Sequence, residues 1–151
     1  DAAVVASLNG ALKRRIGRSA YVVETLRQIA AWPFPHLTLT LDGAPREAAQ
    51  VIATKGRFYG GRFVLAPDAA PDAAGISACV FDRGGWWPAL RAGIALPLGL
   101  LPGLDGLTRR RVAALEVAAP AGLPVQADGD LIGATPVMVT DAAMPIAVVV
   151  P

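Results

Sequence analysis

The sequence predicts a mainly β domain, a sandwich or a barrel, with helices in its N-terminal third. Before residue 32, apolar residues recur every three or four positions, as they do in helices that bury one face. From residue 36 onward, apolar and polar residues alternate over short segments that end at glycine or proline. This pattern is typical of antiparallel strands and their turns. The length of 151 residues suits one domain.

Two helices are expected in the N-terminal third. Residues 2–16 place their large aliphatic side chains on one face, and Gly17 follows as a helix stop. Ser19 is suited to cap a second helix, because its hydroxyl can accept a hydrogen bond from the first turn. That helix is expected to end at residues 32–35, since a residue before proline is pushed out of the α region.

Short strands are expected after residue 36. Leu37, Leu39 and Leu41 alternate with polar residues, and Asp42-Gly43 follows as a turn signal. Further short strand candidates lie between glycine- and proline-containing turns, at residues 47–54, 62–66, 75–81, 112–118, 123–127, 135–139 and 146–150. Residues 86–98 interrupt this series and fit a short helix or an amphipathic excursion better than a strand.

Composition and charge exclude several classes of protein. Hydrophobic residues make up 54% of the chain and charged residues 17%, so the chain as a whole is not intrinsically disordered. A formal net charge of +2 gives too weak a field for nucleic acid to be the expected partner. Proline and glycine interrupt the apolar runs before they reach the about 20 residues that a membrane-spanning helix needs. We therefore expect a soluble or peripheral domain.

The single cysteine and the single histidine limit the metal and redox chemistry of the chain. Cys79 cannot form a disulfide within the chain, and its apolar neighbours favour a buried, inert thiol. Cys79 and His36 are too few for a zinc site of the usual kind. The sequence also contains no phosphate-binding Gly-Lys-Ser/Thr loop, no dinucleotide fingerprint and no nucleophile elbow.

Two further stretches have open interpretations. Arg109, Arg110 and Arg111 are suited to contact phosphate or acidic lipid, but the solvated start of a strand explains them more simply. The aromatic residues 86–88 stand beside the apolar residues 98–102. Such a stretch can touch a membrane interface, line an acyl-chain pocket or pack in the core.

Several short motifs follow one another along the chain in a specific order. Asp1-Ala2 and Gly17-Arg18-Ser19-Ala20-Tyr21 come first, followed by Gly60-Gly61-Arg62 and Ala66-Pro67-Asp68-Ala69. Gln126-Ala127-Asp128-Gly129-Asp130 comes next, and the last predicted strand ends in Val150-Pro151. In this order the motifs resemble the C-terminal half of the diacylglycerol kinase catalytic family, the bacterial lipid kinases related to sphingosine kinases. The likeness spans essentially all 151 residues.

The resemblance implies a two-domain enzyme of the diacylglycerol/NAD kinase-like fold. Its N-terminal α/β domain would carry a Gly-Gly-Asp-Gly-Thr nucleotide loop, which this sequence does not contain. Residues 1–151 would form a single C-terminal domain, a two-layer β-sandwich that closes over the nucleotide. The intact enzyme would transfer the γ-phosphoryl group of ATP to a lipid hydroxyl with Mg²⁺. This chain alone would be inactive.

The same resemblance implies four site residues. Asp130 corresponds to the acidic residue of an Asp-Gly-Glu turn that takes the hydroxyl proton, although aspartate is about 1.5 Å shorter than glutamate. Asp72 lies in a loop that resembles an Asp-Asp-Gly magnesium site from which one aspartate is lost. Lys55, where the family often has asparagine, and Arg57 would face phosphate, with a solvated loop as the plainer alternative for both.

The expected partners are ATP and Mg²⁺, held mainly by the missing nucleotide-binding domain, and a lipid with a free hydroxyl. We expect no nucleic-acid partner, a cytoplasmic location with peripheral contact to the inner membrane face, and leave a homodimer open. Two other functions stay open. The chain can be a non-catalytic lipid- or partner-binding module of the same fold, in which Asp130 in place of glutamate records lost activity. It can also belong to a soluble-substrate kinase related to NAD kinase.

Overall fold

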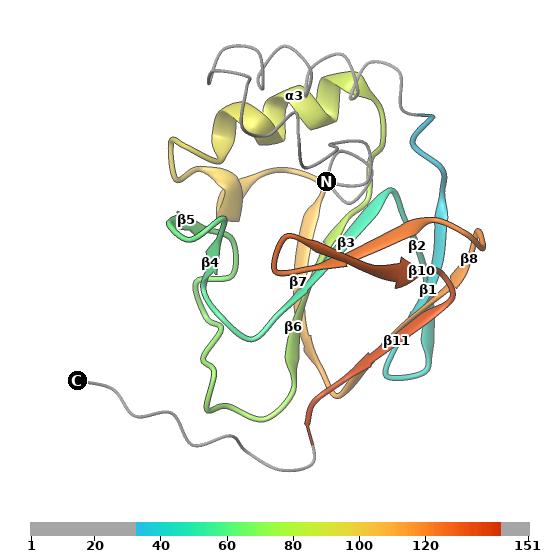
Figure 1. Ribbon diagram of the computed structural model, residues 1–151. Coiled ribbons are helices and arrows are strands. Elements are labelled where there is room, and N and C mark those ends of the chain that lie inside the picture. Colours follow the sequence, from blue (N-terminus) through green and yellow to red (C-terminus); the bar gives the residue numbers. More distant parts are fainter. Residues whose placement is uncertain (1–32, 143–151) are drawn as a thin grey trace.

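Short antiparallel strands dominate residues 33–142, the part of the chain that the computed structural model describes (Figure 1). The helical segments are α3 (Trp86–Ala95) and the 3-10 turn η1 (Leu101–Gly103). The strands in chain order are β1 (Leu37–Leu41), β2 (Ala44–Ala48), β3 (Gln50–Thr54), β4 (Phe58–Tyr59), β5 (Phe63–Val64), β6 (Ile76–Phe81), β7 (Leu107–Val112), β8 (Ala114–Ala119), β9 (Pro124–Ala127), β10 (Asp130–Ala134) and β11 (Val137–Thr140). The two predicted N-terminal helices and the strand predicted at residues 146–150 lie outside the described residues.

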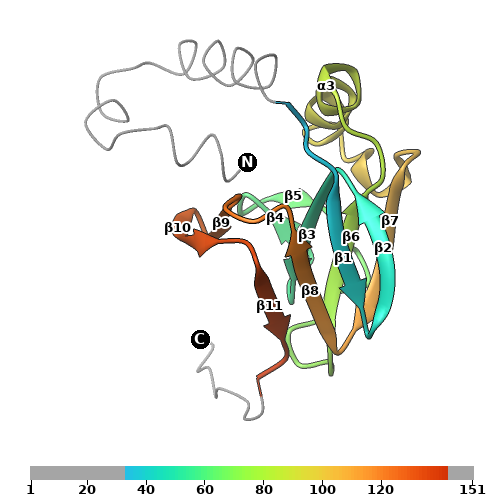
Figure 2. The ribbon, with the colours of Figure 1, turned by 90° about the vertical axis from the view of Figure 1, so that its right-hand side faces the viewer.

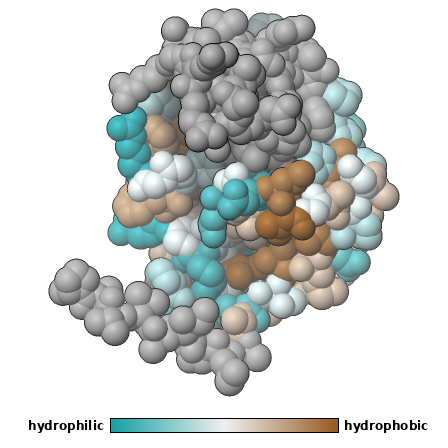
Figure 3. Space-filling view, viewed as in Figure 1, coloured by the Kyte–Doolittle hydropathy of each residue, from teal (hydrophilic) through white to brown (hydrophobic). Residues whose placement is uncertain are grey.

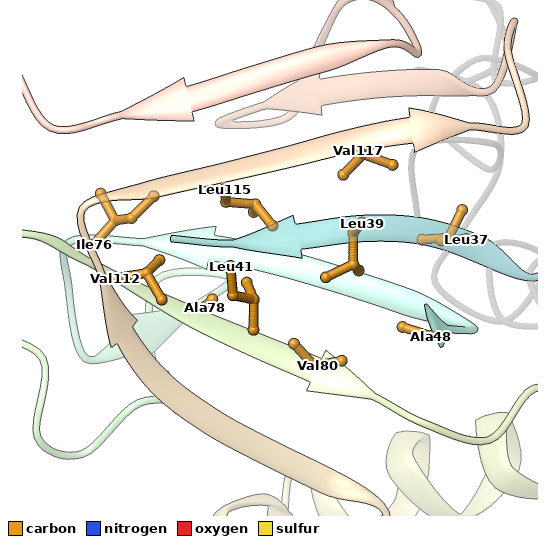
Figure 4. Packing of buried hydrophobic residues seen from close by; sticks show 10 residues of the cluster. All are labelled: Leu37, Leu39, Leu41, Ala48, Ile76, Ala78, Val80, Val112, Leu115 and Val117. Carbon is orange, nitrogen blue, oxygen red and sulfur yellow. The ribbon is translucent and has the colours of Figure 1, made fainter. Parts of the chain in front are cut away.

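Two antiparallel sheets face each other (Figure 2). One has the strand order β11-β8-β1-β2 and the other the order β3-β6-β7. The inward side of β1 carries a leucine at every second position, and the inward side of β6 carries Ile76, Ala78 and Val80 (Figure 4). Successive side chains of a strand point to opposite faces, so this spacing directs all of them into one core. The predicted two-layer β-sandwich is confirmed.

Strand β6 is buried on its second face as well. There Cys79 is fully buried and packs with Leu65, Ala95 and Leu101 in a second apolar cluster, to which α3 and η1 contribute. Burial raises the pKa of the Cys79 thiol to about 11, so almost none of it is thiolate at neutral pH. The predicted buried thiol is confirmed.

Several local predictions are also confirmed. Leu37, Leu39 and Leu41 lie in β1 and are buried. The Asp42-Gly43 turn joins β1 to β2, with φ values of 51° and 81° that match a two-residue hairpin turn. The short helix expected within residues 86–98 is α3.

Three features of the strand region differ from the predictions. Residues 47–54 divide into β2 and β3 at Ala49, whose N–H group donates to Phe81 O at 2.8 Å. Arg109 and Arg111 lie inside β7 and not before a strand, because their backbone pairs with β6 while their guanidinium groups reach loop carbonyls. Strand β10 was missed because all five of its residues are exposed and show no alternation in burial.

Leu39 provides a test of the core, since it is fully buried between the two sheets. Leu39→Ala removes packed apolar atoms and leaves a cavity, so we expect the free energy of unfolding to fall by about 2–5 kcal/mol. Urea denaturation measures this change. Leu98→Ala, at a leucine that is 63% exposed, is the matched control and should change stability by less than about 0.5 kcal/mol. Equal losses in the two variants would contradict this packing.

Candidate functional site

A groove of about 1720 Å³ opens between the two sheets along their free edges. Strand β3, at the edge of one sheet, lines one side of it, and β11 with its neighbour β8 lines the other. The β9–β10 hairpin lies to one side of the two sheets (Figure 2) and contributes Val125, Asp130 and Leu131 to the groove lining. The groove therefore combines residues from both layers with residues from a separate hairpin.

Asp128 and Gly129 form the tip of this hairpin. Both have positive φ, 49° and 96°, which is the geometry of a two-residue type I′ turn. Asp130 pairs with Ala127 directly across the turn, so the strand ladder fixes its backbone. Its side chain is exposed at the groove. This location leaves the Asp130 carboxylate accessible to a substrate, and its role as a base stays a prediction.

Buried Thr135 fixes the other end of the hairpin. Its N–H group donates to Leu123 O at 2.8 Å, and its hydroxyl accepts the N–H of Leu123 at 3.0 Å. The same hydroxyl donates to Pro120 O. Because both ends of the hairpin are held by hydrogen bonds, the carboxylate of Asp130 projects from a defined position.

Apolar and polar side chains share the hairpin. Leu131 and Ile132 are 53% and 62% exposed, and Asp128 and Asp130 are exposed beside them. Figure 3 shows hydrophobic residues next to hydrophilic ones on this face of the molecule. Phe58 of β4 is also exposed and adds an aromatic ring to the groove lining. The groove thus suits a molecule with an apolar part and a polar head.

Lys55 directly follows β3 and lines the same groove. Its ammonium donates to Ala73 O at 2.7 Å and Gly75 O at 3.0 Å. It also bonds to the Asp141 carboxylate, with Nζ to Oδ1 and Oδ2 distances of 2.9 and 3.1 Å. An ammonium has three N–H donors, and these three partners use all of them. A phosphate contact would have to break one of these bonds, which argues against the predicted phosphate role of Lys55.

Asp141 directly follows β11, so its ion pair with Lys55 joins the ends of two edge strands from different sheets. Asp141 also accepts the N–H of Gly75 at 2.8 Å. The hydrogen bonds from Lys55 and Gly75 hold the pKa of the Asp141 carboxyl below its usual value. We call Lys55, Ala73, Gly75 and Asp141 the Lys55 cluster.

Arg57 and Asp72 do not join Asp130 at the groove. Both side chains are exposed, and neither residue is part of the groove lining, although Gly56 and Phe58 on either side of Arg57 are. The backbone of Arg57 has a structural role, because its carbonyl accepts the N–H groups of Leu65 and Ala66. The phosphate role of Arg57 stays a prediction.

The loop that contains Asp72 does not fit the magnesium site that the sequence suggests. In residues 33–142 no three histidine, cysteine, aspartate or glutamate side chains gather where they could hold a metal ion. The carbonyls of Ala73 and Gly75 are bonded to Lys55, and those of Ala74 and Asp68 to Arg111. Asp72 is therefore not part of a group of three such side chains in the described residues, and four carbonyls of the loop already bond to side chains of the chain itself. Its role as a magnesium ligand stays a prediction.

The structure distinguishes between the open interpretations of the arginine and tryptophan stretches. Arg109 donates to Pro102 O and Arg111 to two loop carbonyls, so both stabilise loops. Trp86 and Trp87 are exposed and contact each other edge to face, with ring centroids 5.5 Å apart. Core packing is thus excluded for these two tryptophans, while membrane or acyl-chain contact stays a prediction.

Sequence reasoning missed Asp141 altogether. It lies 86 positions from Lys55, and neither residue belongs to a local pattern that points to the other. The only signal in the sequence was an aspartate two residues after the strand predicted at residues 135–139.

Comparison with known proteins assigns the family. The family model described as "YegS C-terminal NAD kinase beta sandwich-like domain" matches residues 1–150. The chain belongs to this family. The sheets described above agree with the β-sandwich in the description of the YegS C-terminal domain family.

A solved structure shares the fold of this YegS C-terminal domain. It is the crystal structure of a "putative diacylglycerol kinase" from Bacillus anthracis str. Sterne, with 17% sequence identity and a TM-score of 0.58. The match covers 89% of this chain and 45% of that chain, so the present chain spans less than half of that protein. None of the curated proteins compared with the chain matches it. None of the helices in residues 33–142 is long and apolar enough to span a membrane.

The lowered pKa of Asp141 predicts a pH dependence of stability. A carboxyl whose pKa is lower in the folded state stabilises the protein above its unfolded pKa of about 3.9, and this contribution is lost as pH falls through the folded value. We expect the free energy of unfolding to drop as pH falls below about 4, and Asp141→Asn to remove part of this slope. Urea denaturation at a series of pH values measures both slopes.

Asp72→Asn is the matched control for Asp141→Asn, because Asp72 lies exposed on the loop that contacts Asp141. This variant should keep the wild-type slope. If Asp141→Asn keeps the wild-type slope as well, the ion pair with Lys55 does not contribute to the pH dependence.

Proposed function

We propose that this domain is the substrate-side half of an ATP-dependent lipid kinase in which Asp130 is the general base. The observation that carries the proposal is the placement of Asp130: an exposed carboxylate directly after the tip of a hairpin held at both ends, on a groove with apolar and polar lining. Membership of a family described as NAD kinase-like supports the kinase class. The described function of the Bacillus anthracis protein supports diacylglycerol as the substrate class.

The proposed reaction divides the work between two domains. The nucleotide domain would supply ATP, and Mg²⁺ bound with the ATP would neutralise charge on its phosphates. The Asp130 carboxylate accepts the proton of the lipid hydroxyl while that oxygen bonds to the γ-phosphorus and the bond to ADP breaks. The phosphoryl group ends on the lipid and the proton on Asp130, from which it returns to water.

The surroundings of Asp130 suit a lipid better than a wholly polar substrate. Leu131, Ile132 and Phe58 are exposed around the same groove, where burial of an acyl chain would remove apolar surface from water. The Asp130 carboxylate would then meet the headgroup. A lipid hydroxyl placed in this way lies between its apolar tail and the carboxylate.

A soluble-substrate kinase is the second candidate, because the family description names NAD kinase. Both candidates use the same base and differ in where the product is found. A phosphorylated lipid partitions into organic solvent, whereas a phosphorylated nucleotide or sugar stays in water.

Kinase assays of the full-length protein test the role of Asp130. With radiolabelled ATP and detergent-dispersed diacylglycerol, Asp130→Asn should lower kcat about 100-fold or more, the usual contribution of a positioned base. Asp128→Asn, on the same turn, is the matched control and should stay close to wild type, because asparagine tolerates positive φ. Asp130→Glu restores the longer side chain and should raise turnover.

Three outcomes would contradict parts of this proposal. Equal activity of Asp130→Asn and wild type would exclude Asp130 as the base. Product found only in the aqueous phase would favour the soluble-substrate kinase. No turnover in either wild type or Asp130→Glu would favour a non-catalytic binding module.

A further inference from the structure

The ammonium of Lys55 is enclosed by oxygen atoms from two distant parts of the chain. Two of them are the backbone carbonyls of Ala73 and Gly75, in the loop between β5 and β6. The third partner is the carboxylate of Asp141 after β11. All donor–acceptor distances lie between 2.7 and 3.1 Å, so there is a partner for each of the three donors of the ammonium.

This set of oxygens is of the kind that hard cations select. Backbone carbonyls together with a carboxylate are typical ligands of Ca²⁺ and Mg²⁺. In this chain the ammonium group of Lys55 bonds to these oxygen atoms, where a metal ion would otherwise lie. Arg111 extends the pattern, because it donates to Ala74 O at 3.1 Å and to Asp68 O at 2.9 Å. Four carbonyls of one loop are therefore bonded to two cations that the chain itself supplies.

The backbone of the loop is shaped around this arrangement. Gly75 has a φ of 80°, and a Cβ atom at this position would lie 2.9 Å from Val112 O. Only glycine can pass so close to β7. The tight path also directs the N–H of Gly75 to Asp141, at 2.8 Å, so the carboxylate is held by the loop as well as by Lys55.

We propose that Lys55 is the resident cation of this loop, and that its ammonium takes the place of a divalent metal ion in joining the loop to the end of β11. This differs from the expectation that the loop around Asp72 binds Mg²⁺. It is also independent of the proposed kinase function, because it concerns how the chain holds one end of the groove between β3 and β11.

Thermal unfolding of the nucleotide-free protein tests this proposal without any substitution. The melting temperature should be the same in EDTA, in Mg²⁺ and in Ca²⁺, since the loop carbonyls are already bonded. A saturable rise in the melting temperature with Mg²⁺ or Ca²⁺ that Asp72→Asn abolishes would overturn the proposal.

Substitution of Lys55 provides the second measurement. Lys55→Met keeps most of the side-chain length but removes the charge and the hydrogen bonds to all three partners, and should lower the melting temperature by about 4 °C or more. Arg57→Met removes an exposed cation two residues away and should change it by less than about 2 °C. Equal effects of the two substitutions would overturn the proposal.

Chemical rescue tests whether the lower melting temperature of a Lys55 variant is caused by loss of the ammonium group. Lys55→Ala leaves space beside the carbonyls and Asp141, so millimolar ethylammonium should raise the melting temperature of this variant and leave wild type and Arg57→Ala unchanged. Rescue by Mg²⁺ but not by ethylammonium would overturn the assignment to an ammonium. If the Lys55 variants do not fold, the melting temperatures of the wild-type protein in EDTA, Mg²⁺ and Ca²⁺ decide whether the loop binds a metal ion.

Discussion

Strand β6 must be buried on both of its faces, and the position of most other elements depends on this constraint. One face packs against β1 and β8 in the core between the sheets, and the other packs under α3 and η1. Since β6 pairs with β3 on one side and β7 on the other, it also sets where these two strands end and what lies beside them. Lys55 follows β3, Arg111 lies in β7, and Gly75 directly precedes β6. Lys55, Arg111 and Gly75 are thus brought to the same loop because β3 and β7 both pair with β6.

The groove lies along one pair of sheet edges, where the core-facing residues of β3 and β11 are only partly buried. Strands β3 and β11 remain edge strands, and the ion pair between Lys55 and Asp141 joins their ends. The base of the β9–β10 hairpin is closed by the hydrogen bonds between Thr135 and Leu123. The two sheets bury the residues of the core and so provide stability. The hairpin carries exposed residues that are free to contact a substrate. A substitution in the hairpin can therefore change binding with little cost to the fold.

The sequence was informative where burial follows a simple period. Alternating leucines predicted β1, a short apolar segment predicted β6, and Asp42-Gly43 predicted the turn between β1 and β2. The sequence was less informative where side chains serve contacts distant in the chain. Three consecutive arginines concealed β7, because two of them use their guanidinium groups to bond loop carbonyls. Asp130 could be placed at a turn from its Asp-Gly neighbours, but the pairing of Lys55 with Asp141 depends on two sheets coming together and leaves no local trace.

The burial of Cys79 allows an introduced cysteine to be labelled selectively. It is the only cysteine of the chain, it is fully buried, and burial raises its pKa to about 11. Thiol reagents such as maleimides attack the thiolate, so the native protein offers them almost no target. A cysteine introduced at the hairpin tip would then be the single labelled position, and a fluorophore or spin label attached there would report hairpin motion without removal of the natural cysteine.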